Sequence, residues 1–188
     1  MTGAPFSGDL TPSLVVRLRL GEAEAGETLE RLYRAAIVRF AWGYLRSLDE
    51  AEDAAQEIFA RVLQSATVPD DFRVWLYRVA RNHCLNLVRS RRRRRDDARL
   101  PTGAELPDSL TGNLSRLVRE EDRERLAELL ERLPEHLREV LRLRYTEELG
   151  RAEIAAVLEL PVSVVKSRLF EGLKKLRADC DLDSGAAP

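Results

Sequence analysis

Residues 71–94 have the sequence DFRVWLYRVARNHCLNLVRSRRRR, and this stretch decides the fold of the chain. Its apolar residues recur at the three- and four-residue spacing of one helical face. The pattern predicts one long helix that buries a single stripe, on which Cys84 is a small core residue and not a reactive thiol. The stripe consists of Leu76, Val79, Ala80, Cys84, Leu87 and Val88.

The opposite face of this predicted helix is basic. Between Arg73 and Arg95 there are nine arginines and no acidic residue, so this stretch carries +9 although the chain as a whole has a net charge of −1. Clustered arginines supply affinity for phosphates, and interspersed asparagines hydrogen-bond base edges. The pattern favours nucleic-acid binding over a solvated charged face or a nuclear localisation signal. The residues of this face are Arg78, Arg81, Asn82, Asn86, Arg89, Arg91, Arg92, Arg93, Arg94 and Arg95.

Trp75 lies at the start of the basic face and has two interpretations. Its ring either packs in the core beside Phe72 or is exposed and stacks on an unpaired base.

Composition excludes several classes of protein. The chain has 188 residues, 44% of them hydrophobic, which is enough for one ordinary domain or two small ones. No apolar run approaches the length of a membrane span, and the N-terminus lacks a recognisable secretory signal, so we expect a cytoplasmic protein without membrane insertion. Two cysteines and two histidines, Cys84, Cys180, His83 and His136, do not form a metal or disulfide framework. We therefore expect no cofactor and no enzymatic activity.

Helical periodicity continues through most of the chain, and strand-like alternation is missing, which predicts an all-α fold. The proline- and glycine-containing segment 96–115 interrupts the periodicity and predicts a flexible linker between two small helical domains. The acidic tail from residue 179 is predicted to be disordered. The expected helices cover residues 11–20, 27–45, 49–64, 71–94, 115–133, 134–143, 151–158 and 161–177.

The last two expected helices have the proportions of a helix-turn-helix. The second of them would bury Val162, Val165, Leu169, Leu173 and Leu176. Small polar and basic residues on the opposite face suit entry into a major groove, with phosphates contacted alongside. That opposite face carries Ser163, Lys166, Ser167, Phe170 and Lys174.

Three stretches together resemble the extracytoplasmic-function (ECF) sigma factors of bacterial RNA polymerase, in the sigma-70 family. They are AEDAAQEIFARVLQS (51–65), FRVWLYRVARNHCLNLVRSRRRR (72–94) and LERLPEHLREVLRLRYTEELGRAEIAAVLELPVSVVKSRLFEGLKKLR (130–177). The similarity covers roughly residues 11–178. It implies a region 2-like domain at 11–95, a linker at 96–115, a region 4-like helix-turn-helix domain at 116–178 and a disordered tail at 179–188.

The resemblance also implies roles for individual residues. The first domain would bind core polymerase and the promoter −10 element, and the second would bind the −35 element. The helix that docks on the clamp helices of the largest polymerase subunit is matched by Glu52, Asp53, Gln56, Glu57 and Phe59. The loop that captures a flipped −10 base is matched by Ser65, Ala66, Thr67, Val68, Pro69, Asp70 and Asp71. The −10 contacts are Arg78, Arg81, Asn82, Asn86, Arg89, Arg91 and Arg92, and the −35 contacts are Ser163, Lys166, Ser167, Arg168 and Lys174.

Further partners implied by the resemblance are promoter DNA, the flap of the second-largest polymerase subunit and an anti-sigma factor. The family usually has glycine in the helix-turn-helix turn, where this chain has Glu159. Either Glu159 adopts a left-handed conformation or the turn differs. Glu171 in the last helix adds repulsion toward DNA, and Gly172 weakens the helix interior.

Two interpretations from other classes remain open. One is a two-domain DNA-binding regulator that acts without polymerase, which would bring no polymerase subunits on purification. The other is a helical signalling adaptor whose arginines bind an acidic protein, which would lack strongly salt-dependent binding to DNA.

Overall fold

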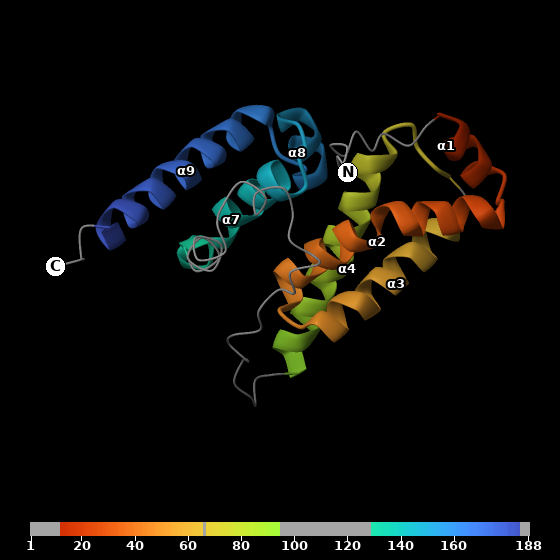
Figure 1. Cartoon of the computed structure of the whole chain (residues 1–188), viewed down its shortest axis with the longest axis horizontal. Helices are drawn as coiled ribbons and strands as arrows, with labels where there is room; N and C mark the ends of the chain where they lie inside the picture. The colour runs from red at the N-terminus through yellow and green to blue at the C-terminus, as the bar shows by residue number, and fades with distance from the viewer. Residues whose placement is uncertain (1–11, 66, 95–128, 185–188) are drawn as a thin grey trace, which may run out of the picture. The chain divides into compact units, whose positions relative to one another are not determined.

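The computed structural model describes residues 12–65, 67–94 and 129–184 (Figure 1). Within these ranges the regular structure is entirely helical, which confirms the all-α prediction. The chain divides into two compact units, one ending at Leu110 and the other beginning at Thr111. The predicted linker lies outside the described residues, so its boundaries stay a prediction.

The first unit contains four described helices. They are α1 (Pro12–Arg19), α2 (Ala23–Leu45), α3 (Leu48–Leu63) and α4 (Phe72–Arg94). The three long helices all contact one another, and α1 packs on α2. The prediction placed the start of α2 at residue 27, which is wrong, since the helix begins at Ala23.

The core of the first unit lies between α2, α3 and α4. Small residues of α3, Ala51, Ala54 and Ala55, are at most 1% exposed and allow α3 to approach its neighbours closely. Aromatic residues fill the remaining space, with the Phe40 and Tyr77 ring centroids 5.3 Å apart at a steep angle. Burial of each large apolar side chain stabilises the unit by about 1.5–3 kcal/mol.

The second unit contains helical residues 129–132, α7 (Glu135–Leu141), the π-helix η2 (Arg142–Thr146), α8 (Arg151–Leu158) and α9 (Val162–Ser184). The helix expected from Pro134 is present as α7, which passes at Arg142 into a π-helical turn. The predicted disorder from residue 179 is wrong as far as Ser184, because α9 continues to that residue.

Helix α9 packs on both α7 and α8. Val165 and Leu169 are buried as expected, but Val162 and Leu173 are 40% and 38% exposed, so the predicted stripe was too wide. Gly172 is buried, and a Cβ atom there would lie 2.9 Å from Cδ1 of Leu141. Gly172 therefore allows α9 to approach α7, which compensates for its poor helix propensity.

The turn between α8 and α9 depends on Glu159. Its φ of 57° and ψ of 45° are left-handed, the first of the two conformations left open for it. The turn is closed by hydrogen bonds from the backbone N–H groups of Glu159 and Leu160 to the carbonyl of Ala155. A side chain in this conformation costs roughly 1 kcal/mol that glycine avoids.

We expect Glu159→Gly to stabilise the second unit by about 1 kcal/mol, because the left-handed strain disappears. Slower hydrogen exchange of the α8 and α9 amides would report the gain. The control Ala178→Gly, in the exposed interior of α9, should instead lower protection by about 1 kcal/mol. Faster exchange in Glu159→Gly would contradict the role given to this turn.

Candidate nucleic-acid interface

Helix α4 is one continuous helix from Phe72 to Arg94, as predicted. Leu76, Ala80 and Cys84 are fully buried, which confirms the apolar stripe and the core position of the cysteine. Val79, Leu87 and Val88 are only partly buried. The stripe is completed instead by Phe72, Tyr77 and His83, which are 2%, 2% and 3% exposed.

The face of α4 opposite this stripe carries the predicted amides and cations. Asn82, Asn86 and Arg89 are exposed, and they follow one another at helical spacing. Arg78 and Arg81 lie beside them and are partly buried. The helix therefore presents amide groups flanked by guanidinium groups along one side, as contact with a polyanion requires.

Trp75 packs beside Phe72, as the first interpretation predicts, and its stacking on an unpaired base stays a prediction. Its ring centroid lies 5.6 Å from that of Phe72, which is buried, yet Trp75 itself remains partly exposed. Part of the indole thus packs on the core while the rest faces solvent.

Arg91 differs from the other predicted DNA contacts. Its Nη1 donates a hydrogen bond of 2.9 Å to the carbonyl of Leu45, at the end of α2, and its Nη2 pairs with Glu50 of α3. A cation at the carbonyl end of a helix is favourable. Arg91 therefore joins three helices of the first unit. The side chains of Arg92 and Arg94, and all of Arg95, lie outside the described residues.

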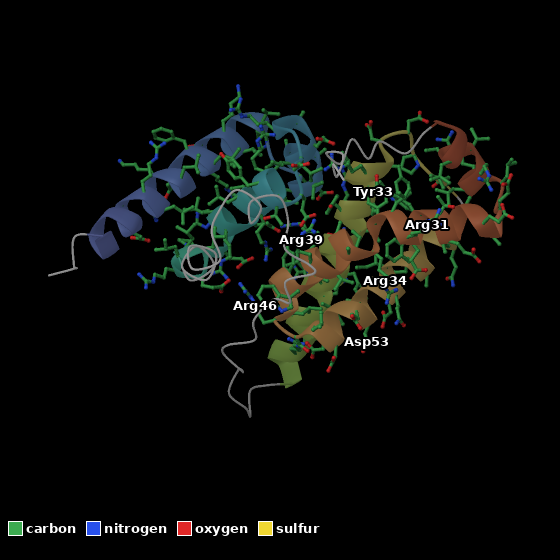
Figure 2. All side chains as sticks on the ribbon, in the orientation of Figure 1. Arg31, Tyr33, Arg34, Arg39, Arg46 and Asp53 are labelled. Carbon is green, nitrogen blue, oxygen red and sulfur yellow. The ribbon has the colours of Figure 1, made fainter. Side chains whose placement is uncertain are left out.

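Helix α3 bears an acidic face. Glu52, Asp53 and Gln56 are exposed, and Asp53 projects outward from α3 (Figure 2). Phe59, matched to the same docking helix, is 2% exposed and packs in the core, so its ring is not part of this surface. Glu57 is exposed but turned toward α4, where its Oε2 lies 3.7 Å from Nε2 of His83.

His83 is a buried titratable group on α4. Burial lowers its pKa from the ordinary 6.5, the charge of Arg61 lowers it further, and Glu57 opposes the shift. The folded state therefore holds a neutral imidazole near pH 7.

We expect the first unit to lose stability as the pH falls below about 6.5, because the unfolded chain then protonates His83 and the folded chain does not. In the wild type, the midpoint temperature for thermal unfolding of the first unit should therefore fall between pH 7 and about 5.5. In His83→Gln this fall should be smaller. His136→Gln removes an exposed histidine of the second unit and should leave the decrease unchanged. Equal slopes in the wild type and in His83→Gln would refute this origin of the pH dependence.

The segment between α3 and α4 contains the loop matched to base capture. Ala66 lies outside the described residues. Ser65 Oγ donates to the carbonyl of Thr67 at 2.9 Å, and Val68 is 7% exposed and anchors the loop on the unit. Pro69 is partly buried, while Asp70 and Asp71 are exposed.

This loop has a partner that sequence reasoning missed. Arg19 of α1 donates from Nε to the carbonyl of Val68 at 2.7 Å, and its Nη2 pairs with Asp70 Oδ1 at 2.8 Å. The contacts join residues about fifty positions apart, and no local sequence pattern signals such a pairing.

The exposed face of α9 agrees with the prediction for the helix-turn-helix. Ser163, Lys166, Ser167 and Lys174 are exposed, and Arg168 is partly buried. Phe170 is 71% exposed on the same side. Glu171 Oε1 lies 3.5 Å from Lys175 Nζ, a pairing of adjacent helical turns. The N-terminus of α8 is capped by the Glu153 carboxylate, which accepts from the Gly150 N–H at 2.5 Å.

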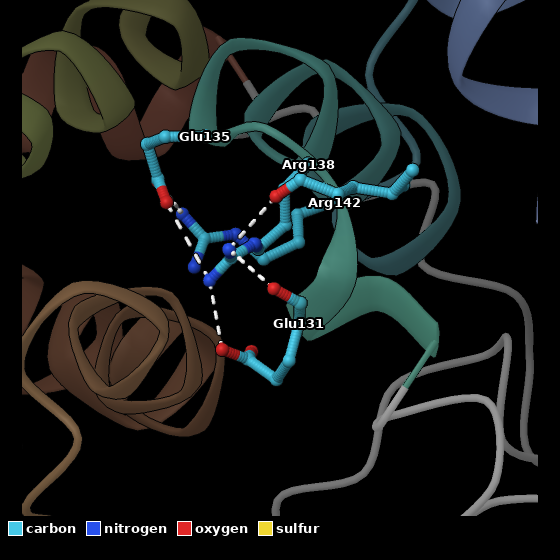
Figure 3. Close-up of polar contacts among 5 residues, drawn as sticks. Glu131, Glu135, Arg138 and Arg142 are labelled. Carbon is cyan, nitrogen blue, oxygen red and sulfur yellow. Dashed lines mark hydrogen bonds and ion pairs between the residues drawn. The ribbon is translucent and has the colours of Figure 1, made fainter. Parts of the chain in front are cut away.

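Two neighbouring arginines, Arg138 of α7 and Arg142 of η2, pair with the carboxylates of Glu131 and Glu135. Figure 3 shows Arg138 and Arg142 beside each other, between Glu131 and Glu135. Arg138 donates at 2.9 Å to the carbonyls of both Glu131 and Leu133, and its Nη1 lies 2.8 Å from Glu131 Oε2. Burial lowers the pKa of Arg138, which nevertheless remains a cation. Arg138 therefore links residues 131 and 133 to α7, and Arg142 pairs with Glu135 in the first turn of α7.

The described residues contain neither a metal site nor a membrane-spanning helix. Across residues 12–65, 67–94 and 129–184, no group of three His, Cys, Asp or Glu side chains is placed to hold a metal ion. No described helix combines the length and the apolar composition that a membrane crossing requires.

Each of the two helical units has an exposed face of polar and basic residues, on α4 in the first and on α9 in the second. Family models match both units. Sigma-70 region 2 matches residues 29–94, and sigma-70 region 4 matches residues 123–176. The first match spans α3 and α4, and the second spans the helix-turn-helix.

Characterised relatives agree with these matches. The chain is 31% identical to the RNA polymerase sigma-H factor of Pseudomonas aeruginosa, over 84% of this chain and 86% of the relative. It is 31% identical to the ECF RNA polymerase sigma factor SigW of Bacillus subtilis, over 87% and 92% of the two chains. For the ECF RNA polymerase sigma-E factor of Escherichia coli the identity is 30%, over 84% and 87%.

A solved structure is also similar to this chain. It shows CnrH in complex with the cytosolic domain of CnrY, with 25% identity, a TM-score of 0.67 and coverage of 91% of this chain and 97% of the other. The chain belongs to the extracytoplasmic-function sigma factors of the sigma-70 family. As an alternative sigma factor, it directs promoter recognition in transcription initiation.

Proposed function

We propose that the two units divide promoter recognition, the first binding the −10 element and the second the −35 element. The observation that carries the proposal is that the first unit has a basic face and an acidic face on neighbouring helices. The amide and arginine face of α4 is exposed, and the neighbouring helix α3 exposes an acidic face. One unit thus contacts a polyanion and a basic protein surface together. It acts by binding, performs no covalent chemistry, and works in the cytoplasm, where promoter DNA lies.

The −10 contacts are proposed for the exposed side of α4. Asn82 and Asn86 supply amides that both donate to and accept from bases, and Arg78, Arg81 and Arg89 contact phosphates. Arg91 is left out of this set because it bonds the end of α2 and Glu50. Its role is to hold α4 at the orientation that presents the other five side chains.

Polymerase docking is proposed for the exposed side of α3, through Glu52, Asp53 and Gln56. Their carboxylates and amide complement a basic surface of core polymerase, for which the resemblance suggests the clamp helices. Glu57 contributes less because it faces His83 and Arg61. Phe59 supports the surface from beneath, as a core residue.

Promoter opening is proposed for the loop between α3 and α4 together with α4. Moving one base out of the stacked duplex costs a few kcal/mol, and binding of that base in a protein site offsets this cost. The described part of the loop, with Ser65 and Thr67–Asp71, adjoins the start of α4, where Trp75 is partly exposed. Stacking on this indole would add affinity for an unpaired strand.

The −35 contacts are proposed for Ser163, Lys166, Ser167, Arg168 and Lys174 of α9. Four of these side chains are exposed on the second helix of the helix-turn-helix, as major-groove entry requires. The second unit would also bind the polymerase flap. An anti-sigma partner that covers these surfaces is proposed by analogy with CnrH, which is seen with the cytosolic domain of CnrY.

The division of surfaces has a direct test. We expect Asn86→Asp with Arg89→Glu to reduce promoter opening at least tenfold while core polymerase binding stays near normal, because each change places an anion toward DNA. Glu52→Lys with Asp53→Lys should weaken polymerase binding at least tenfold and leave opening near normal once polymerase is saturating. All four positions are exposed, so the fold should survive. Permanganate footprinting measures opening, and fluorescence anisotropy measures polymerase affinity.

Each double variant controls for the other, since both change exposed charges of the same unit. Equal loss of opening and of polymerase binding in both variants would refute the assignment of the two faces. Loss of opening in the α3 variant is expected to disappear when polymerase is supplied well above its dissociation constant.

A second prediction concerns Glu171. Removing its carboxylate in Glu171→Gln should raise affinity for duplex DNA about fivefold at low salt, because repulsion toward phosphates ends and Lys175 is released. The gain should be similar for −35 and unrelated duplexes when measured by anisotropy. The control Asp179→Asn removes the same charge about two turns further along α9 and should have little effect. An equal gain in both variants would point to net charge alone.

A further inference from the structure

The contact between Arg19 and the loop that follows α3 has no counterpart in the roles assigned above. Arg19 is the last residue of α1, whereas Val68 and Asp70 lie between α3 and α4. Nε of Arg19 lies 2.7 Å from the Val68 carbonyl oxygen, and Nη2 lies 2.8 Å from Asp70 Oδ1. One planar guanidinium therefore bonds two points of the loop at once.

The two bonds differ in strength. The Asp70 side chain is 94% exposed and that of Arg19 is 43% exposed, so water and salt weaken their ion pair. Val68 is 7% exposed, and its carbonyl accepts a charge-assisted bond in a partly buried setting. The bond to Val68 is thus the main restraint on the loop backbone, and the ion pair fixes the rotation of the guanidinium.

Helix α1 is itself held firmly, so it can act as a support. Leu14 and Val15 are each 7% exposed, and α1 packs on α2. Gly21 has a φ of 72° and reverses the chain between the two helices. The position of Arg19 is therefore set by the body of the unit and not by the loop.

We propose that Arg19 is a positioning residue for promoter opening, which shapes the loop before an unpaired base arrives. Ordering a loop during binding costs conformational entropy, and a loop already held in its binding shape avoids that cost. The proposal rests on the proposed function of this loop in base capture. Arg19 does not need to touch DNA, since it acts through the backbone at Val68.

The test uses the full chain in complex with core polymerase. A promoter that the protein recognises is first identified by mapping transcription start sites in vitro. The probe is the single-stranded non-template −10 segment of that promoter. It is used either intact or with an abasic site at one position, and each position is tested in turn. With the wild type, one abasic position should lower affinity about tenfold, since the lost contact is that of one captured base. In Arg19→Ala this penalty should shrink to about twofold or less, because the loop is no longer preformed.

The matched control is Arg17→Ala, which removes the same charge from the same helix but leaves the loop contacts in place. It should keep the full abasic penalty. Arg19→Lys retains the charge but lacks the planar fork, so its penalty should fall between those of the wild type and Arg19→Ala. This variant also serves if Arg19→Ala unfolds, which circular dichroism would show.

Three results are distinguishable. An abasic penalty that is reduced in the Arg19 variants and retained in full in Arg17→Ala supports the positioning role. A full penalty in Arg19→Lys and in folded Arg19→Ala overturns it and leaves base capture by the loop intact. A wild type with no abasic penalty at any position overturns base capture itself, and the role of Arg19 with it.

Discussion

The burial of one stripe of α4 against α2 and α3 is the constraint on which the first unit depends. Leu76, Ala80 and Cys84 have no exposed surface, so the helix has a single favourable rotation about its axis. That rotation places Asn82, Asn86 and Arg89 in solvent. The proposed DNA face is therefore a consequence of core packing, and any change that rotates α4 would move every side chain of that face.

The charged residues of the first unit serve two purposes. Arg91 and Arg19 lie where segments meet and bond backbone carbonyls of α2 and of the loop after α3. Exposed residues such as Arg89 and Asp53 lie on faces that partners would cover. A high arginine content thus supports both the internal arrangement of helices and binding, and composition alone does not separate the two uses.

The second unit achieves its geometry with two residues that depart from helical preference. Glu159 has a left-handed backbone in the turn before α9, and Gly172 lets α9 approach Leu141 of α7. Each of these residues lowers the local stability of the backbone, and the tertiary packing that it allows offsets this loss. Arg138 adds a third restraint, because it donates hydrogen bonds to the backbone carbonyls of Glu131 and Leu133. The exposed face of α9 is held by these contacts.

The sequence by itself determined the all-α class, the continuous α4 with its buried Cys84 and exposed Asn82 and Asn86, and the helix-turn-helix, because helical periodicity is a local property. Only the tertiary structure decided that Arg91 bonds α2 and α3, that α9 continues to Ser184, and that Arg19 reaches the loop after α3. These features depend on which segments meet in space, and such contacts leave no periodic signal along the chain.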